Sequence, residues 1–450
     1  MGWRPLSLSP LLLASAAGLA GRRQVCTGLF VASCAPPASA AALASSIASP
    51  RFASGAAATF ERIEGSGTDG RLYALLRLPD GARCILACAA PSLGFDADRG
   101  PLLTAQRLEL AVTMGCGSMR DPKEWEGLAH LAEHVTLGSE AGTELAEYVD
   151  QFDGSLNGFT SEELTTFHAE LPAIEGGEAE AAAVVEALAM RFAALFDCWR
   201  ATPLSAHREV VERELRRVDE ELVATRTQPS RQLLELGQYK ARANPESRWA
   251  RLGRGSAATL PVSRLDDIRS AVDSFRTSGY APLGATLALC SPLPLPLAAS
   301  IISDIFKRRS ATFRPVLRAL KRGPPPFGSG HETQPMAVAR PGRYACLTVG
   351  WCIPTDDRVV VARAKPFAIL GEAFTAPHAA SAVEVLRAAS IAPLAVEMEP
   401  ALTSRVVAAA DGWSLWQVTL VMLPGSEKRW CARGLVGHRG GCAMGPTNAV

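Results

Sequence analysis

The chain has almost no net charge, no C-x-x-C pair and no long apolar run outside its N-terminal region. Its 46 basic and 45 acidic residues nearly cancel, so the overall charge indicates neither a nucleic-acid partner nor an acidic membrane surface. The eleven cysteines are scattered and odd in number, which argues against a disulfide framework in a chain of 450 residues. No later run reaches the roughly 18 apolar residues of a membrane-spanning helix, so no transmembrane segment is expected.

Acidic residues are also missing from the N-terminal region, where none occurs before Glu61. Arg4 precedes an apolar run over 6–20, as in a secretory signal peptide. The stretch 22–58 is rich in Ala and Ser and contains Arg but no acid, as in an organellar transit peptide. Residues 1–58 are therefore expected to be a targeting segment that does not fold. Its destination is the secretory pathway, a mitochondrion or a plastid, and the two signals could act in sequence or singly.

The remaining chain alternates strand and helix patterns in two halves. Hydrophobic residues make up 48% of the sequence, enough for two domains with separate cores. Residues 71–90 read as a hairpin around Pro79-Asp80-Gly81. The other strands expected before the Pro-rich linker at 322–328 cover 108–114, 156–171 and 285–290, and the helices cover 123–137, 144–152, 178–195, 204–226 and 297–306. After the linker we expect strands at 344–353 and 416–422 and helices at 365–374 and 379–389. This pattern predicts an α+β protein made of two units of similar plan.

The segment His130-Leu131-Ala132-Glu133-His134 carries the clearest chemical pattern. Positions i, i+3 and i+4 share one face of a helix, and two imidazoles one turn apart can bind one metal ion. Zn²⁺ is the expected ion for nitrogen and carboxylate ligands. Glu133 would take a proton from the water at the metal and later deliver it to a leaving amine, as in the inverted zincin pattern. The same spacing also arises by chance on polar helix surfaces, so the pattern alone leaves both interpretations open.

A catalytic zinc site needs a third protein ligand from another element. The helix expected at 204–226 offers five glutamates, Glu209, Glu212, Glu214, Glu220 and Glu221. Glu214 and Glu221 are separated by about two turns and face the same way. Spacing by itself does not choose between them.

Three segments together resemble the insulinase (pitrilysin) family of zinc metallopeptidases. Residues 127–140 resemble its active-site helix, and Gly154-Ser-Leu-Asn-Gly-Phe-Thr-Ser-Glu162 resembles the Gly-Ser-x-x-Asn-Ala-Phe-Thr-Ser stretch that follows in the family. Residues 213–221 resemble its pattern Arg-Glu-Val-x-x-Val-Asp-x-Glu. A weaker likeness covers 65–425, including the loop at 253–256 and a helix expected at 267–280. It is similar to the N-terminal half of the insulin-degrading branch.

The resemblance implies a role for each residue of these segments. His130, His134 and Glu221 would bind one Zn²⁺ per chain, Glu133 would be the catalytic base, and Glu214 would support the ligands from outside the coordination sphere. The segment Asn157, Gly158, Phe159 and Thr160 would form an edge strand that receives a peptide substrate by strand addition, or else an ordinary strand and turn.

The resemblance also implies two homologous domains, each a mainly antiparallel sheet packed with helices. The zinc-binding catalytic domain would cover 65–300, a second, metal-free domain 325–425, and an irregular tail 427–450. The implied function is a zinc endopeptidase that hydrolyses peptides or small unfolded proteins.

Three departures from the family pattern qualify this function. The interval from His134 to Glu221 is longer than usual, which leaves Glu220 or Glu214 as other possible ligands. Ala132 and Thr136 replace bulkier residues. The insulin-degrading branch normally has four homologous domains, and this chain stops after two. The alternative is therefore a catalytically silent subunit or substrate-binding module, with a second insulinase-like half or a homo- or heterodimer partner. An unrelated α/β binding protein is the third class of function.

Overall fold

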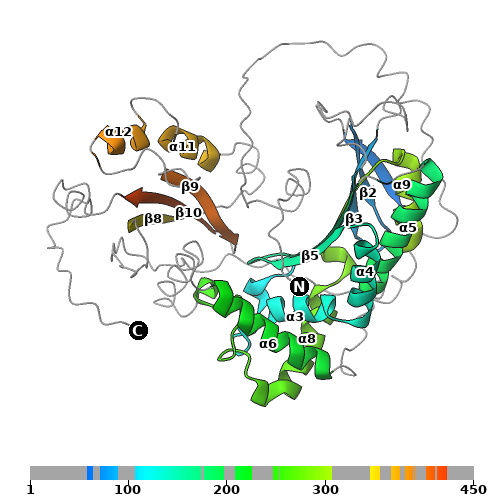
Figure 1. Cartoon of the computed structure of the whole chain (residues 1–450), viewed down its shortest axis with the longest axis horizontal. Coiled ribbons are helices and arrows are strands. Elements are labelled where there is room, and N and C mark those ends of the chain that lie inside the picture. The colour runs from blue at the N-terminus through cyan, green and yellow to red at the C-terminus, as the bar shows by residue number, and fades with distance from the viewer. Residues whose placement is uncertain are drawn as a thin grey trace, which may run out of the picture. The chain divides into compact units, whose positions relative to one another are not determined.

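The computed structural model describes residues 58–63, 71–89, 107–172, 174, 177–196, 208–225, 247–251, 253–306, 345–354, 366–375, 381–388, 390, 402–410 and 413–422. They divide into two units (Figure 1), the first holding most residues up to 306 and the second holding those from 345 onward together with 247–250. The expected linker at 322–328 and tail at 427–450 lie outside the described residues, as does nearly all of the expected targeting segment.

The first unit is built on a seven-stranded sheet with the strand order β1-β2-β3-β7-β4-β6-β5. Neighbouring strands are antiparallel except β3 and β7, which run parallel. The strands are β1 Thr59–Ile63, β2 Arg71–Arg77, β3 Arg83–Ala89, β4 Leu108–Met114, β5 Ser155–Thr160, β6 Thr165–Leu171 and β7 Ala285–Ser291. Every residue of β4 is buried. β5 forms one edge of this sheet, which makes its outer backbone groups available for pairing.

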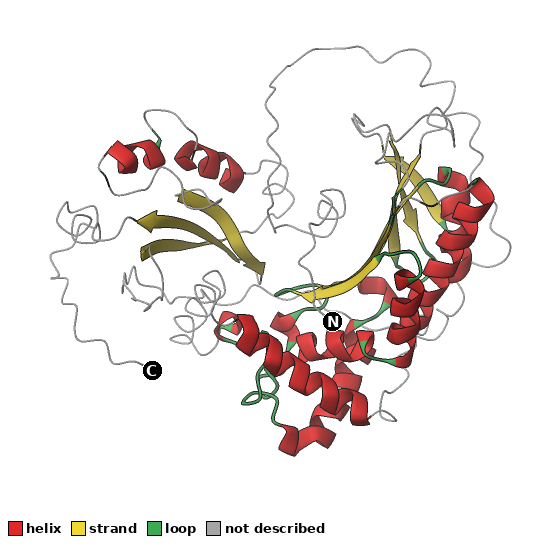
Figure 2. Ribbon diagram, viewed as in Figure 1, coloured by secondary structure: helices red, strands yellow, loops and turns green. Residues whose placement is uncertain are grey.

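Helices cover the sheet in two groups (Figure 2), with α4, α5 and α9 packed along it and α3, α6 and α8 gathered near β5. Their bounds are α3 Leu128–Leu137, α4 Glu140–Asp150, α5 Glu178–Leu195, α6 Arg208–Thr225, α8 Leu265–Gly279 and α9 Leu295–Phe306. Short 3₁₀ turns of this unit lie at Ser118–Arg120, Val262–Arg264 and Pro282–Gly284, and a further one at Arg248–Ala250 belongs to the second unit. The core includes the fully buried rings of Phe167, Phe192 and Phe306. Burial of each such side chain contributes about 1.5–3 kcal/mol.

The expected hairpin and the strands at 108–114 and 285–290 are confirmed, as is the helix at 178–195. The expected start of the motif helix near Lys123 is wrong, because α3 begins at Leu128. Gly127 precedes it with φ of 93°, a left-handed conformation that interrupts helical geometry. The following helix begins earlier than expected, at Glu140, because the Ser139 hydroxyl accepts the amide of Gly142 as an N-cap.

The second unit is a three-stranded antiparallel sheet in the order β8-β10-β9, accompanied by two helices. Its elements are β8 Ala345–Pro354, α11 Pro366–Thr375, α12 Ala382–Ala388, β9 Leu402–Ala410 and β10 Trp413–Met422. The rings of Phe367 and Trp416 lie 6.3 Å apart and join α11 to β10. The sequence pattern missed β9, as it missed β1 in the first unit. The described residues thus form an α+β fold with mainly antiparallel sheets.

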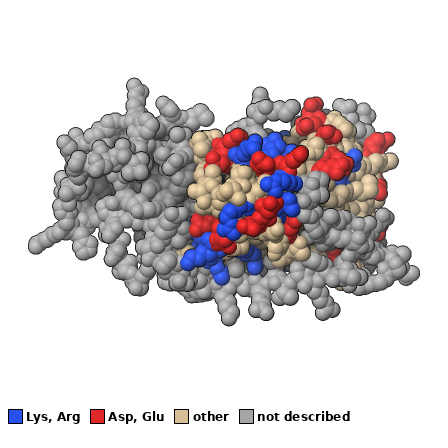
Figure 3. Space-filling view, turned by 90° about the horizontal axis from the view of Figure 1, so that it is seen from below, with Lys and Arg blue, Asp and Glu red and all other residues tan. Residues whose placement is uncertain are grey.

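The face of the first unit that carries α6 and α8 is strongly charged, with both signs interleaved (Figure 3). Arg216 pairs with Glu212 on α6, and Arg208 of α6 reaches Asp266 of α8. Exposed pairs of this kind contribute about 0–1 kcal/mol each. None of the described helices is long and apolar enough to cross a membrane.

Candidate metal centre

The chain positions the motif helix through a polar contact at its first turn. The buried carboxylate of Asp121 accepts the backbone N–H groups of Gly127 and Ala129, at 2.7 and 2.8 Å. These two donors have no partner within the helix, so the carboxylate fixes where α3 begins. His130, Glu133 and His134 then follow on one face of α3.

His130, His134 and Glu221 form a group of three metal-ligating side chains whose candidate ligand atoms all lie within 4.8 Å of one another. Glu221 Oε2 is 3.4 Å from His130 Nε2 and 3.4 Å from His134 Nε2. The two imidazole rings are 4.7 Å apart and nearly perpendicular, at 86°. Within the described part of the chain this is the one such group.

This geometry fits a zinc ion. Bonds of about 2.0–2.2 Å at tetrahedral angles place two ligand atoms roughly 3.3–3.5 Å apart. Both nitrogen-to-oxygen distances in the cluster are 3.4 Å. Two imidazoles and one carboxylate are also a ligand set typical of catalytic zinc, with a fourth position left for water.

Each imidazole has a partner at its other nitrogen. His130 Nδ1 lies 2.8 Å from the carbonyl oxygen of Arg254. A carbonyl can only accept, so Nδ1 is the donor in this contact and Nε2 is the nitrogen that faces Glu221. His134 Nδ1 lies 3.6 Å from Glu214 Oε2. Partners of this kind fix the ring orientation of metal-binding histidines.

Glu214 is nearly fully buried at 1% exposure, and two arginines of its own helix neutralise it. Arg213 Nε and Arg217 donate to Glu214 Oε1 at 2.8 and 2.9 Å. Arg213 also donates to the carbonyl of Gly138, just after α3. The pKa of Glu214 is lowered because contacts with His134, Arg213 and Arg217 outweigh the opposite effect of burial. Glu214 therefore lies beside the cluster as a carboxylate held between α3 and α6.

The cluster favours positive charge at its centre. Hydrogen bonds with His130 and His134 hold the pKa of Glu221 well below its usual range. Burial lowers the pKa of His134, but the carboxylates of Glu214, Glu221 and Glu133 outweigh it and raise that pKa to about 9. The surrounding carboxylates thus stabilise a proton or a cation at this position.

Glu133 lies next to the cluster but outside it. Its Oε2 accepts the hydroxyl of Thr160 at 2.6 Å. A Cβ on Gly158 would lie 2.8 Å from Glu133 Oε1, so a larger residue there would require the carboxylate to shift. Burial raises the pKa of Glu133, and the neighbouring His130, Thr160 and His134 act in the opposite direction. A carboxylate in this environment can exchange a proton with a nearby water.

The four residues expected on the edge strand do lie on β5. Gly158 and Thr160 face Glu133, whereas Asn157 and Phe159 alternate to the other side of the sheet. The ring of Phe159 lies 6.5 Å from that of His168 on β6. The segment thus divides into one pair beside the candidate base and one pair on the opposite face.

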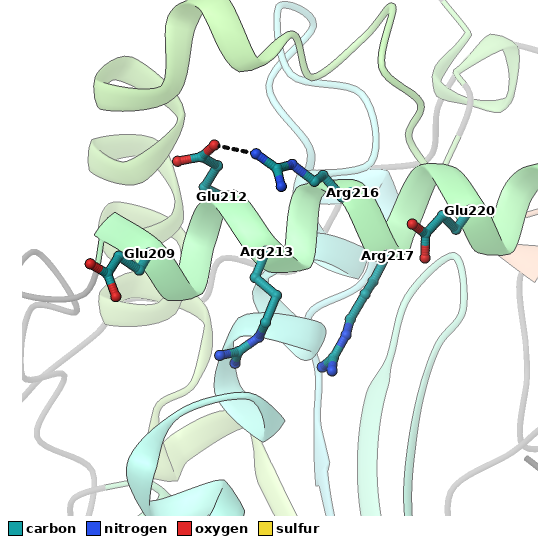
Figure 4. A pocket seen from close by; sticks show the side chains of 6 residues that line it. All are labelled: Glu209, Glu212, Arg213, Arg216, Arg217 and Glu220. Carbon is teal, nitrogen blue, oxygen red and sulfur yellow. Dashed lines mark hydrogen bonds and ion pairs between the residues drawn. The ribbon is translucent and has the colours of Figure 1, made fainter. Parts of the chain in front are cut away.

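Among the glutamates of α6, the geometry brings Glu221 to the histidines. Glu209, Glu212 and Glu220 instead line a surface cavity of about 410 Å³ with three arginines of the same helix (Figure 4). Figure 4 shows Glu212 paired with Arg216 on one side of α6, while Arg213 and Arg217 extend from another side.

Sequence reasoning missed Asp121 and Arg254, and it did not link Thr160 to Glu133. Asp121 precedes α3 by seven residues, a spacing that no capping motif covers. The pattern Gly253-x-Gly255 was a signal that backbone approaches closely there, but it carried no information on the side chain of Arg254.

Comparison with known proteins agrees with this geometry. The family model described as "Insulinase (Peptidase family M16)" matches residues 103–238, which include all three members of the cluster. "Protease 3" of Escherichia coli (strain K12) is 28% identical over 255 residues, covering 55% of this chain and 23% of that protein. "Insulin-degrading enzyme" of Mus musculus is 26% identical over 237 residues, covering 51% of this chain and 20% of the enzyme. The matches thus span about a quarter or less of the length of these curated relatives.

Solved structures show the same fold. The crystal structure of pitrilysin superposes with a TM-score of 0.58 at 19% identity, covering 83% of this chain and 36% of that one. A peptidase M16 inactive domain from Pseudomonas fluorescens gives a TM-score of 0.54 at 12% identity, with 80% and 77% covered. Residues 103–238 of the chain thus match the M16 insulinase/pitrilysin family, and the chain is a distant homologue of protease 3 and insulin-degrading enzyme over its N-terminal region.

Proposed function

We propose that the protein is a zinc-dependent endopeptidase that hydrolyses peptides or small unfolded proteins. The observation that carries this proposal is the pair of 3.4 Å distances from Glu221 Oε2 to the Nε2 atoms of His130 and His134. They equal the spacing of ligand atoms on one tetrahedral zinc ion. Membership in a peptidase family supports the same reaction class.

His130, His134 and Glu221 would hold the zinc, which when bound polarises the scissile carbonyl and makes water more acidic. Glu133 then does the proton transfer. Its carboxylate takes a proton from the attacking water and returns it to the nitrogen of the leaving amine. Thr160 keeps one oxygen of Glu133 oriented by a hydrogen bond, so the other is free for the water.

The peptide would bind along β5. This strand pairs with β6 on one side and lies at the edge of the sheet, so its other side offers backbone donors and acceptors. An extended peptide added there would be paired by its backbone, with little dependence on its side chains. Gly158 lies against Glu133 on this strand, which supports a path for the peptide next to the catalytic base.

We further propose that the second unit, with its β8-β10-β9 sheet, is a metal-free insulinase-like domain. The matches span about a quarter or less of the curated relatives' length. We propose another insulinase-like chain or a second copy of this chain as its partner.

A second candidate function is a catalytically silent subunit or substrate-binding module. Similarity to a solved M16 domain described as inactive favours it. In that case the chain would bind peptide along β5 without cleaving it.

The test is zinc content and cleavage of a quenched fluorescent peptide by the wild type and by Glu133→Gln. The endopeptidase proposal expects one zinc per chain in both proteins and loss of cleavage in the variant by a factor of at least about 10². Zinc in neither protein would overturn it. Zinc without cleavage, in the wild type alone and with candidate partner chains, would support the silent subunit.

A further inference from the structure

Arg254 contacts two of the three proposed metal ligands through two different groups. Its main-chain carbonyl accepts from His130 Nδ1 at 2.8 Å, and its guanidinium donates to Glu221 Oε1 at 2.6 Å. We infer that Arg254 is a positioning residue for the metal site: it orients His130 and limits Glu221 to one coordinating oxygen. This inference rests on the proposed zinc site.

The carbonyl contact is fixed by backbone packing, not by the arginine side chain. Gly127, just before α3, and Gly255 both have positive φ, at 93° and 72°. A Cβ on Gly127 would lie 2.1 Å from Gly255 Cα, so the two main chains touch. A Cβ on Gly253 would lie 2.6 Å from Ser118 Oγ. The peptide that carries the Arg254 carbonyl is therefore held against the first turn of α3, where His130 begins the motif.

The guanidinium contact is fixed at two points of α6. Besides Glu221, Arg254 donates to the hydroxyl of Thr225 at 2.6 Å, one turn further along the helix. The Arg254 side chain is only 14% exposed, whereas that of Glu221 is 39% exposed. A partly exposed glutamate would otherwise sample several rotamers, and the fixed fork of an arginine suppresses them.

The two oxygens of Glu221 therefore have different partners. Oε1 is occupied by Arg254, and Oε2 is the atom that lies 3.4 Å from both imidazoles. With Oε1 engaged, Glu221 can offer one oxygen to an ion. One-oxygen coordination keeps the fourth position of a tetrahedral site available for water.

The positive charge of Arg254 also repels a metal cation. This repulsion weakens metal binding, whereas the orientation of Glu221 by Arg254 strengthens it. Two carboxylates lie close to His134, with Glu214 Oε2 at 3.6 Å and Glu221 Oε2 at 3.4 Å from its ring nitrogens, and they favour a cation there. We therefore expect the orientation of Glu221 to outweigh the repulsion. Residues that hold metal ligands in place usually change metal affinity by about 10–100-fold, and we expect an effect of this size.

The test measures Zn²⁺ affinity by chelator competition and the visible spectrum of the Co²⁺-loaded full-length chain. The variants are Arg254→Met, Arg254→Lys and the control Arg216→Met. Arg216 is a suitable control, because it also pairs with a glutamate of α6, Glu212, at 2.6 Å. Its side chain is far more exposed than that of Arg254, at 67%, and it lies outside the metal site. None of these substitutions changes the backbone carbonyl that contacts His130.

Arg254→Met should bind Zn²⁺ at least about tenfold more weakly than Arg216→Met. Its Co²⁺ spectrum should change as Glu221 gains a second coordinating oxygen. Arg254→Lys, which can reach Glu221 but not also Thr225 with the same geometry, should fall between wild type and Arg254→Met. Thermal unfolding of the metal-free proteins separates these effects from misfolding.

Equal affinity and equal spectra for Arg254→Met and Arg216→Met would overturn the inference while leaving the zinc site intact. Tighter binding by Arg254→Met would overturn it as well, since repulsion would then dominate. Absence of stoichiometric metal in the wild type would instead reject the proposed function, and the inference with it.

Discussion

The carboxylate of Glu133 has different neighbours at its two oxygens. Oε2 accepts the Thr160 hydroxyl, and Oε1 lies next to Gly158, where an added Cβ would come within 2.8 Å of it. One oxygen is thus held by a hydrogen bond, while the other lies beside the backbone of β5 and remains available to a water. This arrangement orients the proposed base relative to the strand that would carry the peptide.

Removing the Thr160 hydroxyl should impair catalysis without affecting the metal. Thr160→Val keeps the shape of the side chain but deletes the donor to Glu133, a hydrogen bond to a charged group worth about 1.5–3 kcal/mol. We expect kcat to fall by about tenfold or more, with zinc content unchanged. The measurement is steady-state cleavage of a quenched peptide together with metal analysis.

The matched control for this substitution is Thr143→Val. The Thr143 hydroxyl donates to the carbonyl of Ser139, the N-cap residue of α4, and is not part of the cluster. It should leave kcat near the wild-type value. A Thr160→Val protein with unchanged kcat would show that the hydrogen bond does not orient the base.

At this scale the sequence could predict the residue types of the site but not their mutual contacts. The motif spacing brought His130, Glu133 and His134 to one face, because helical geometry is local. Glu221 could be chosen only through a resemblance, since its distance from the histidines depends on how α6 packs against α3. The contact of Arg254 with Glu221 joins residues 33 positions apart and has no local signature.

Among the elements, α3 depends most on a contact from outside the helix. Asp121 satisfies two backbone donors at its N-terminal end, and Arg251 donates to the Asp121 main-chain carbonyl. Because His130 lies in the first turn, a change in how α3 begins would move a proposed metal ligand directly.

Asp121→Asn should therefore destabilise the first unit and weaken metal binding together. An amide has a single acceptor oxygen, so one of the two backbone N–H groups would face an NH₂ group. A buried donor without a partner costs about 1–3 kcal/mol. Chemical denaturation should show a loss of this size.

Asp150→Asn at the exposed end of α4 makes the same chemical change without this contact and should be neutral. Equal stability of the two variants would contradict the assigned role of Asp121.

The helices and strands that could be predicted are those whose hydrophobic and turn residues form a clear pattern within the segment itself. The helix α5 matches its expected bounds because its Ala-rich run follows Gly177, whose backbone N–H donates to the side chain of Glu180 in the first turn. β1 and β9 could not be predicted in this way. β1 is mostly exposed and gains its structure from pairing with β2, which is a non-local interaction.

For the whole molecule, metal binding should couple to folding. The three proposed ligands come from two helices, α3 and α6, so they converge only in the folded first unit. A ligand that binds only the folded state stabilises it by about 2.7 kcal/mol at a concentration 100 times its Kd.

Removal of zinc with a chelator should accordingly lower the Tm of the first unit. For a domain of its size, about 2.7 kcal/mol corresponds to a shift of roughly 5–10 °C. Differential scanning calorimetry with and without chelator measures it, and added Zn²⁺ should restore the original Tm. A Tm that is indifferent to chelator would mean that the cluster holds no zinc under these conditions.

The central claim is that His130, His134 and Glu221 together bind one zinc ion. The most direct measurement is zinc stoichiometry of the purified full-length chain for wild type, Glu221→Gln and Glu220→Gln, which change neighbouring residues of α6. We predict one zinc per chain for wild type and for Glu220→Gln, and little or none for Glu221→Gln. Equal zinc in all three proteins, or loss in Glu220→Gln alone, would contradict the assigned metal site.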